Sequence, residues 1–526
     1  MSSTLANSRR LSINALFGML LSLSRLPLTF IMTPIYIAFL GTHSFGTWAL
    51  LNGIVLFTSF SYLGMPSSIT KHVAHHYARG ERRELNALIN SSNLVHLGLA
   101  LAVAVVFLGM WPALVPAFFT DVELSLETIF ITYVLLLVGV IVGLLGNSYS
   151  SMLHGIQRTD MQSGISLTSR LLMAVAGWMA LRQGYGMAGL AAAGVVGEAY
   201  RVAAIVVVCR RLVPEVRFQP LNVRWDVVRE VTSFGAKLLL GGGAMVAFVQ
   251  IDKMLLDRFS TKVAVGLYAI VSSFCMQLRN YPFLMQRPTL AATSELSARG
   301  ERVRLERMYR KAQKYGLLLA TMIFAGVAAL GAPFLDLWIG DQYTPAEIAL
   351  AAWALRILAA GHLLAAAGYS PHFIAIGLHR PGISTRATLV TAGLNLVLSV
   401  ALGWVWGFYG IVIASSVAMT AGAVYLCQAM TRRSSLRIYA GIWHGMARPL
   451  VAAGAATAAG RFVLVGLDEL TWWTWFAAGA AFTVSYVGML LLLRHISFVE
   501  FVQVLRMKPD NSRTESKKKD GRQAAA

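Results

Sequence analysis

The sequence carries little charge for its length, and acidic charge is the scarcest. Charged residues make up 13% of the 526 residues and hydrophobic residues make up 56%, whereas a soluble protein carries about 25% charged residues. So little polar surface is expected only where lipid, and not water, is the main solvent. The composition therefore argues against a soluble globular protein and predicts an integral membrane protein.

Cysteine is scarce as well, with three in the whole chain. Cys209, Cys275 and Cys427 all fall within apolar segments, and no two of them share a motif. This argues against a disulfide framework and against a zinc site, so the three are interpreted as small buried apolar residues. The histidine cluster at 72–76 lacks the carboxylate or cysteine that would complete a metal set, and we expect a solvated loop there.

Basic residues are present in excess, with 45 Lys and Arg against 24 Asp and Glu and a formal net charge of +21. In a soluble protein this excess would suggest nucleic acid as a partner. Here the basic residues form short clusters between apolar runs, and no face interleaves aromatic with basic residues. The sequence therefore predicts no nucleic-acid binding.

The dominant pattern is a series of apolar runs of bilayer length. A membrane-spanning helix needs about 20 apolar residues, and the first run follows Arg9 and Arg10 but is too long for a signal peptide and lacks a cleavage pattern, so it is expected to be retained. We therefore predict an all-α polytopic membrane protein with about 14 transmembrane helices. The expected spans are 11–39, 46–64, 88–110, 127–150, 164–182, 188–209, 234–257, 264–290, 313–332, 347–376, 387–405, 410–430, 449–466 and 472–493.

The loops on the two sides of the membrane differ in their number of Lys and Arg residues. With the N-terminus on the inside, 34 of the 45 Lys and Arg fall in inside segments and 4 in outside segments. Positive loops face the cytoplasm, so both termini are expected there. The largest outside loops, near 111–126 and 333–345, run to roughly fifteen residues. This leaves little room for the catalytic groups of an outer-face membrane enzyme such as a glycan polymerase or ligase, and we predict that the protein is not an enzyme.

The first twelve expected spans contain an internal repeat. Ala78–Arg82 recurs as Ala298–Arg302, and the Gly46-x-Trp48-Ala49 motif recurs 220 residues later at 266–269. Two further glycine motifs, at 155–158 and 186–189, recur at 377–380 and 407–410. Halves with six helices each insert in the same direction, and proteins built this way bind substrate between the halves near the midplane. The predicted regions are 1–210 (first lobe), 211–233 (cytoplasmic linker), 234–430 (second lobe), 431–493 (two additional helices) and 494–526 (a basic, disordered tail).

Several of these segments resemble a known family. Leu40–Leu50 and Ser59–Met65 resemble the first outer loop and the segment after it in bacterial polysaccharide repeat-unit flippases. Asp252–Leu256, followed by Val265–Ala269, resembles the middle of that family, and Leu337–Gly340 resembles its later outer loop. The resemblance covers roughly 11–430 and extends to the multidrug/oligosaccharidyl-lipid/polysaccharide (MOP) exporter superfamily.

The resemblance implies a flippase that moves an undecaprenyl-pyrophosphate-linked oligosaccharide across the bacterial inner membrane, for O-antigen (lipopolysaccharide), capsule or exopolysaccharide synthesis. Its partners would be the lipid-linked oligosaccharide and membrane lipids, with a polysaccharide polymerase and chain-length proteins as candidates. No cofactor is implied beyond a coupling ion, Na⁺ or H⁺. The alternatives on the same fold are a cation-coupled multidrug or metabolite exporter and a lipid II flippase.

Charged residues inside the predicted spans are the candidate substrate site. An Arg at the bilayer centre costs about 2.5–3.5 kcal/mol and persists where it faces water or a partner. Arg25 and Arg279 lie near span centres, and in the architecture of the superfamily both would face a central cavity and hold a pyrophosphate. Arg287 and Arg356 are weaker candidates. The residues beside Arg279, namely Gln277, Asn280 and Tyr281, complete the predicted site.

Asp252 and Lys253 are adjacent within one predicted span. Neighbouring residues point to different sides of a helix, so the two are expected to have different partners. Both are candidates for coupling or gating, and Asp252 in particular for binding the coupling ion or an arginine. The alternative for Asp252 is an interhelical salt bridge. Glu198 and Arg201, three residues apart, are expected to form an intrahelical ion pair.

Overall fold

The computed structural model describes residues 21, 25–58, 65–119, 124–217, 219, 223–434, 436–467 and 469–495. The side chain of Arg25 and several side chains between 231 and 247 are not described. Most of the first predicted span, the family-like segment at 59–64 and the tail beyond 495 therefore lie outside the described residues, and the predictions for them stay predictions.

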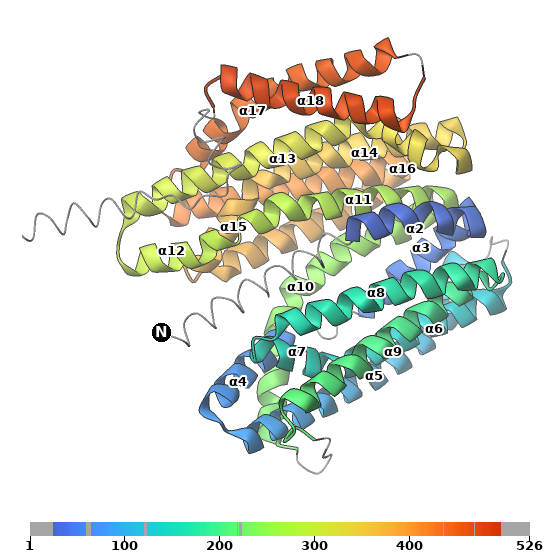
Figure 1. Ribbon diagram of the computed structural model, residues 1–526, viewed down its shortest axis with the longest axis vertical. Helices are drawn as coiled ribbons and strands as arrows, with labels where there is room; N and C mark the ends of the chain where they lie inside the picture. The colour runs from blue at the N-terminus through green and yellow to red at the C-terminus, as the bar shows by residue number, and fades with distance from the viewer. Residues whose placement is uncertain are drawn as a thin grey trace, which may run out of the picture.

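Every regular element in the described part of the chain is a helix (Figure 1). The elements are α2 (Arg25–Leu40), α3 (Thr42–Leu56), α4 (Met65–Arg79), α5 (Arg82–Phe118), α6 (Leu126–Leu145), α7 (Asn147–Gly155), α8 (Thr159–Arg182), α9 (Gly186–Leu212), α10 (Trp225–Phe259), α11 (Lys262–Met285), α12 (Pro288–Ala298), α13 (Arg302–Ile339), η2 (Gly340–Gln342), α14 (Pro345–Ala365), η3 (Ala366–Gly368), α15 (Tyr369–Gly377), α16 (Pro381–Arg433), α17 (Ile438–Gly466) and α18 (Trp472–Leu492).

Within the described residues, nine helices are long and apolar enough to cross a membrane, or ten if α2 and α3, bent by 119° relative to each other, count as one span. The chain is therefore an all-helical polytopic membrane protein, as predicted. This number is not a count for the whole chain, because the predicted spans 11–39, 46–64 and 234–257 lie partly outside what the structure describes. In addition, α16 counts once although it holds two predicted spans in 53 residues, broken at Gly407 with φ 53°.

The sequence repeat has a counterpart in the backbone. Positive φ angles occur in pairs at matching places: Gly80 (72°) with Gly300 (69°), and Gln157 (59°) with His379 (58°). The glycine that opens each copy of the 155–158 motif also packs closely, because an added Cβ would lie 2.9 Å from the Thr70 carbonyl oxygen in the first copy. The second copy meets the Leu290 carbonyl oxygen in the same way, at 2.7 Å. Both motifs therefore specify a turn packed against another helix.

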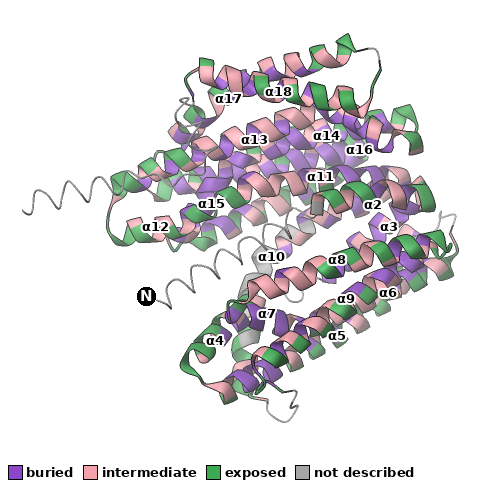
Figure 2. Ribbon diagram, in the orientation of Figure 1, coloured by how far each residue is buried: buried purple, intermediate pink, exposed green. Residues whose placement is uncertain are grey.

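The helices form two side-by-side groups (Figure 1). In one group α6 and α8 both pack on α9, and in the other α13 and α16 both pack on α14. The helix α17 packs on the outer side of α13 and pairs with α18. Large apolar side chains stay exposed on both groups (Figure 2), among them Val105 at 73%, Trp404 at 82% and Val465 at 84%. Such surfaces are stable only against lipid.

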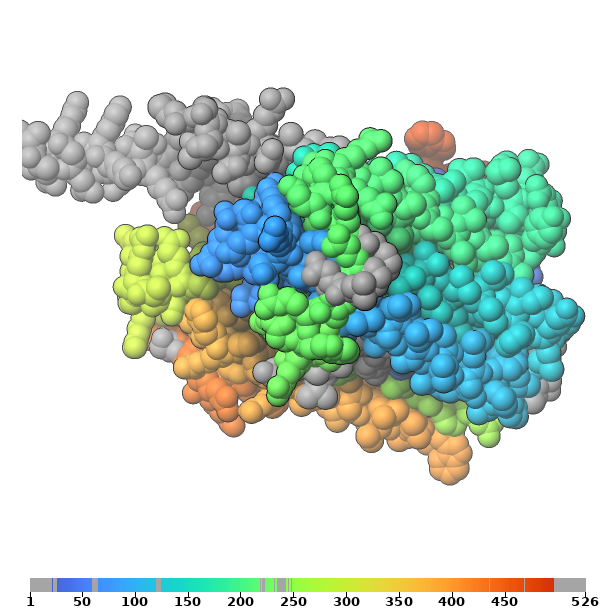
Figure 3. Space-filling view, turned by 90° about the horizontal axis from the view of Figure 1, so that it is seen from below, coloured from blue at the N-terminus to red at the C-terminus, as the bar shows by residue number. Residues whose placement is uncertain are grey.

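The chain between α9 and α10 is fastened to the start of α5. The Asn90 amide donates to the carbonyl oxygen of Arg217 at 2.9 Å, and the Arg217 N–H donates to Asn86 Oδ1 at 3.0 Å. Arg224 then forms ion pairs with Glu84 and Asp226, and its hydrogen bonds lower the pKa of the Asp226 carboxyl below the usual value. The start of α10 consequently lies beside α4, as the space-filling view shows (Figure 3).

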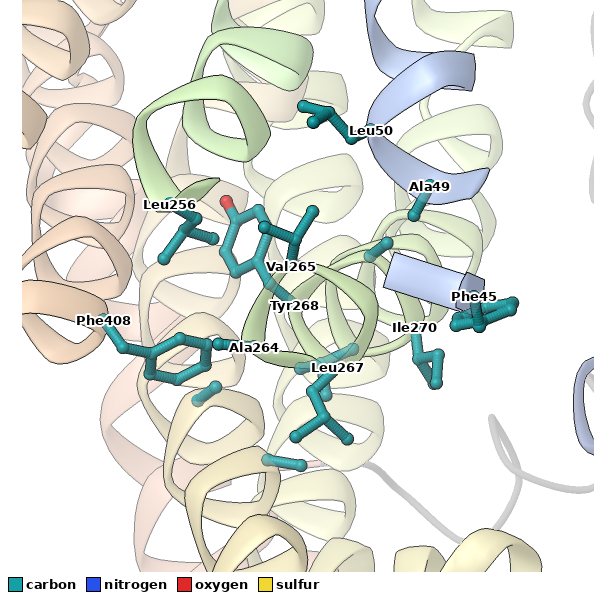
Figure 4. Packing of buried hydrophobic residues seen from close by; sticks show 14 of the residues in the cluster. Phe45, Ala49, Leu50, Leu256, Ala264, Val265, Leu267, Tyr268, Ile270 and Phe408 are labelled. Atoms are coloured by element: carbon teal, nitrogen blue, oxygen red, sulfur yellow. The ribbon is translucent and has the colours of Figure 1, made fainter. Parts of the chain in front are cut away.

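The two groups meet where α3 packs along α11, inside the largest buried apolar cluster (Figure 4). The repeated glycines are the contact points. A Cβ on Gly266 would lie 3.3 Å from the Gly46 Cα, and a Cβ on Gly46 would overlap the carbonyl oxygen of Lys262. The side chains of Phe45, Ala49 and Val265 fill the space around them. Only glycine at 46 allows the two backbones to approach this closely.

We expect Gly46→Leu to separate α3 from α11, because overpacking a tight contact costs about 1–3 kcal/mol. The measurement is maleimide labelling of a cysteine placed at the fully buried Leu50, in a chain lacking its own cysteines. Labelling should accelerate about tenfold. The matched control is Gly98→Leu, since nothing lies within 4 Å of a Cβ at Gly98. Equal labelling in both variants would contradict this role of Gly46.

Candidate functional site

Arg279 lies on α11 and lines a cavity of about 130 Å³. The cavity is walled by α10, α11, the α14–α15 region and both parts of α16, whose residues contribute aromatic, hydroxyl and imidazole groups. Its polar and aromatic lining consists of Arg279, Phe283, His362, Tyr369, His372 and Thr388, together with Phe248, Ser384 and Thr391. The described lining contains no carboxylate, so the charge that it contributes is positive.

The Arg279 guanidinium has aromatic and sulfur neighbours and no acidic one. Its carbon lies 5.2 Å from the centroid of the Phe283 ring, and Nη1 lies 3.2 Å from the sulfur of Met276. No ion pair among the described residues includes Arg279. An aromatic face stabilises the cation without consuming its N–H donors. The donors therefore stay available to an anion.

Three buried polar atoms of the lining lack a hydrogen-bond partner among the described residues: Arg279 Nε, His362 Nδ1 and Tyr369 Oη. Buried polar groups are normally paired, so such atoms indicate a ligand or ordered water. Guanidinium and phenol groups both donate to phosphoryl oxygens. Sequence reasoning identified Arg279 because a central arginine is costly in lipid. It missed His362 and Tyr369, which become neighbours of Arg279 only through helix packing.

The structure separates the other predicted substrate residues from this cavity. Gln277 faces α2, where its amide donates to the Thr29 hydroxyl at 3.4 Å. Asn280 and Tyr281 are half-buried and do not line the cavity. A helix advances 100° per residue, so residues adjacent to Arg279 in sequence point elsewhere.

Two predicted arginines also lie apart from Arg279. Arg287 is exposed at the N-cap of α12. Arg356 projects from α14, with its guanidinium 5.3 Å from the Trp353 ring, and Trp353 is 52% exposed. Neither lines the cavity. The side chain of Arg25 is not described. Of the other three predicted substrate arginines, Arg279 lines the cavity and Arg287 and Arg356 do not.

Asp252 is buried at the centre of a second polar cluster. Its carboxylate is 1% exposed. One oxygen, Oδ2, accepts hydrogen bonds from the hydroxyls of Tyr268 and Ser415, both at 2.5 Å. The other, Oδ1, accepts from the Ser399 hydroxyl and the Asn395 amide, both at 3.1 Å. The donors come from α11 and from both parts of α16, so this carboxylate joins three segments.

The predicted alternative for Asp252, an interhelical salt bridge, is wrong for the described residues, because all four donors are neutral. Among the described residues, no cation in direct contact offsets its negative charge. Asn395 Oδ1, beside it, is buried and lacks a donor. A carboxylate surrounded by hydroxyl oxygens is a ligand set for a hard cation, and an intramembrane Asp is typical of ion and proton pathways.

Lys253 turns away from this cluster. Its ammonium donates to Gln250 Oε1 at 3.0 Å and the side chain is 9% exposed. The stem packs beside Gly53 of α3, since a Cβ on that glycine would lie 3.4 Å from the lysine Cδ. Asp252 thus faces α16 while Lys253 faces α3, on different sides of α10.

The ion pair expected on α9 is confirmed: Arg201 donates to Glu198 at 2.7 Å. Arg201 also contacts the Ser150 hydroxyl at 3.3 Å. The charges of Glu198 and Arg201 therefore offset each other.

His72 pairs with Glu230, and His76 pairs with Glu81. The described part of the chain contains no group of three or more His, Cys, Asp or Glu side chains that could hold a metal ion.

The helical spans, the cationic cavity and the buried carboxylate together define a multi-pass membrane transporter. Residues 12–285, slightly more than half of the chain, match the family described as "Polysaccharide biosynthesis protein". The chain belongs to this family, which confirms the resemblance seen in the sequence.

Two relatives extend the comparison. The chain is 24% identical over 402 residues to the "Uncharacterized membrane protein EpsK" of Bacillus subtilis (strain 168), covering 74% of this chain and 76% of that protein. It is 24% identical over 270 residues to the "Probable low-salt glycan biosynthesis flippase Agl15" of Haloferax volcanii, covering 49% of this chain and 53% of that one. A distant relative is thus named as a glycan flippase.

Two solved structures have a similar fold. One is the "Lipid II flippase MurJ, inward closed conformation", with a TM-score of 0.60 and 13% identity over 88% of this chain and 98% of that one. The other is an inward-facing multidrug resistance MATE family transporter of the MOP superfamily, with a TM-score of 0.63 and 17% identity over 82% and 98%. The chain is therefore a polysaccharide biosynthesis transporter with the MOP fold.

Proposed function

We propose that this protein is a flippase for an undecaprenyl-pyrophosphate-linked oligosaccharide in the bacterial inner membrane, serving O-antigen, capsule or exopolysaccharide synthesis. Fourteen segments cross the bilayer and both termini are cytoplasmic. Two pseudo-symmetric lobes, 1–210 and 234–430, joined by the linker 211–233, alternate access around a central site. The helices within 431–493 lie outside the repeat.

The observation that carries this proposal is Arg279, a guanidinium that has no acidic partner among the described residues and lines a cavity whose described lining has no carboxylate. The headgroup of such a substrate is a diphosphate, which arginine binds through parallel hydrogen bonds. Outward movement of an anion is also favoured by an inside-negative potential, by about 2.3 kcal/mol per charge per 100 mV. The isoprenoid tail would remain in lipid throughout.

Asp252 is the proposed coupling site, occupied by Na⁺ or H⁺ in part of the transport cycle. The support is the unpaired charge of this carboxylate and the orphaned Asn395 oxygen beside it. Because its ligands come from α10, α11 and both parts of α16, a bound cation would draw these segments together. Release of the cation would loosen the same contacts, which links the ion to the packing of the second lobe.

The two alternatives differ in headgroup chemistry. An exporter of cationic compounds requires acidic groups in the cavity, and the lining around Arg279 contains none. A lipid II flippase would bind the same diphosphate but a different sugar. The proposed flippase and a lipid II flippase are therefore distinguished by which lipid-linked molecule the protein moves.

The test is reconstitution of the full chain in liposomes that carry fluorescent undecaprenyl-pyrophosphate oligosaccharide. We expect the protein to expose the glycan on the opposite leaflet, measured with a membrane-impermeant glycosidase, while liposomes loaded with lipid II or with a cationic dye show no protein-dependent movement. In cells, deletion of the gene should cause one lipid-linked glycan to accumulate on the cytoplasmic leaflet. Transport of the dye without the glycan would overturn the proposal.

A further inference from the structure

A pocket separate from the Arg279 cavity collects four arginines at one end of the second helical group. Its volume is about 470 Å³, within the range of roughly 300–1,000 Å³ that small-molecule sites occupy. The charged residues of its lining are Arg302, Arg380, Arg432 and Arg433. They come from the start of α13, the turn before α16 and the end of α16, so tertiary packing brings them together.

No carboxylate partner of the four arginines is found in the part of the chain that the structure describes. The lining contains no Asp or Glu, and no ion pair among the described residues involves any of them. The nearest acid in sequence, Glu301, pairs with Arg304 at 2.7 Å, outside the lining. Arg380 donates to the carbonyl oxygen of Arg433, which holds one guanidinium across the pocket. Four cations converge here, and the described lining supplies no negative charge that offsets their repulsion.

The internal repeat supplies a comparison for this cluster. Arg302 and Arg380 belong to the two motifs that recur from 78–82 and 155–158, so their counterparts in the first half are Arg82 and Arg158. The pair Arg432-Arg433 likewise lies 222 residues after Arg210-Arg211. All four arginines are therefore present in both halves of the chain, at matching topological positions.

The two halves differ at one of these four positions. In the first half Arg158 forms two hydrogen bonds to Asp160, at 3.2 and 3.4 Å, whereas Arg82 lies 4.5 Å from the centroid of the Tyr77 ring and its buried Nη1 lacks a hydrogen-bond partner among the described residues. The position that matches Asp160 is Gly382 in the second half. The second half has thus kept all four arginines and lacks the one acid that pairs with Arg158 in the first half.

We propose that Arg302, Arg380, Arg432 and Arg433 form a binding site for a phosphate-bearing anion at this end of the second half. The forked geometry of guanidinium groups suits the oxygens of a phosphate ester or diphosphate. Two sources share this chemistry, namely the headgroup of an anionic lipid in the adjoining leaflet and a soluble phosphate compound. The site is distinct from the Arg279 cavity and does not depend on the proposed function.

The experiment compares two double variants of the full-length chain. Arg432→Ala/Arg433→Ala removes two exposed guanidiniums from the pocket, and Arg210→Ala/Arg211→Ala removes the matching exposed pair from the first half. Both carry Arg279→Ala, so that binding in the central cavity does not contribute. Inorganic pyrophosphate is titrated calorimetrically in phosphatidylcholine nanodiscs, and retention of added phosphatidylglycerol over phosphatidylcholine is measured by native mass spectrometry.

We expect the Arg279→Ala parent to bind one of the two probes, and the 432/433 variant to bind it about tenfold or more weakly, with the 210/211 variant unchanged. Pyrophosphate binding identifies a soluble ligand, and phosphatidylglycerol retention identifies a lipid. Equal weakening in both variants, or no binding of either probe to the parent, overturns the proposal. If the alanine variant fails to fold, Arg432→Lys/Arg433→Lys replaces it. This variant keeps the charge but loses the paired N–H groups of the guanidinium, so it should still bind the probe more weakly. Unchanged binding would overturn the proposal.

Discussion

Arg279→Ala is expected to lower the rate of lipid-linked oligosaccharide translocation about a hundredfold. The estimate follows from losing a bidentate, charge-assisted contact worth about 3 kcal/mol to a desolvated diphosphate. The measurement is the reconstituted glycan-exposure assay at saturating protein. Because Arg279 has no carboxylate partner among the described residues, its removal leaves no buried acid unpaired, and the free energy of unfolding should change little.

Two variants separate the role of Arg279 from a general loss of charge. Arg279→Lys keeps the positive charge but loses the paired N–H groups of the guanidinium. Its translocation rate should therefore lie between those of the parent and Arg279→Ala. Arg182→Ala removes another guanidinium from an aromatic face, since Arg182 lies 4.8 Å above the Trp178 ring, and it should transport normally because it lies outside the cavity. Full transport by Arg279→Ala would refute the assigned role, as would equal loss in Arg182→Ala.

Asp252→Ala is expected to abolish the dependence of transport on a Na⁺ or H⁺ gradient and also to destabilise the protein. Four donors, on Tyr268, Asn395, Ser399 and Ser415, lose their shared acceptor. Each buried donor left unsatisfied costs about 1–3 kcal/mol. The readouts are transport under imposed gradients and the thermal unfolding temperature in detergent, with and without Na⁺.

Asp252→Asn distinguishes coupling from packing. The amide keeps an oxygen for the donors and removes the charge, so much of the stability should return while the gradient dependence stays lost. The matched control is Glu198→Gln, because that carboxylate also lies in a membrane helix but is already paired with Arg201 at 2.7 Å. Its gradient dependence should match the parent. A gradient response that survives in Asp252→Asn would exclude this residue as the coupling site.

The candidate site shows which signals a sequence carries. Arg279 and Asp252 could be selected because charge is expensive in lipid and rarely kept without a use. Asn395, Ser399 and Ser415 are small, neutral and common in membrane helices, so nothing in their spacing marks them as partners of a carboxylate 143 or more residues away. Gln277 was selected because it is near Arg279 in sequence, and Arg356 because it lies within a predicted span. Each side chain lies on a side of its helix that does not face the cavity.

Composition and hydropathy by themselves determined that this is a helical membrane protein. Each spanning segment must be apolar over the thickness of the bilayer and must satisfy its own backbone hydrogen bonds, and both requirements can be read from a local stretch of sequence. The repeat predicted matching turns, because a left-handed residue such as Gly80 or Gly300 is a local backbone requirement. Which side chains meet was decided by tertiary structure alone. The contact of Gly46 with Lys262, the oxygens around Asp252 and the four converging arginines depend on the rotation and approach of helices far apart in sequence, which no local pattern encodes.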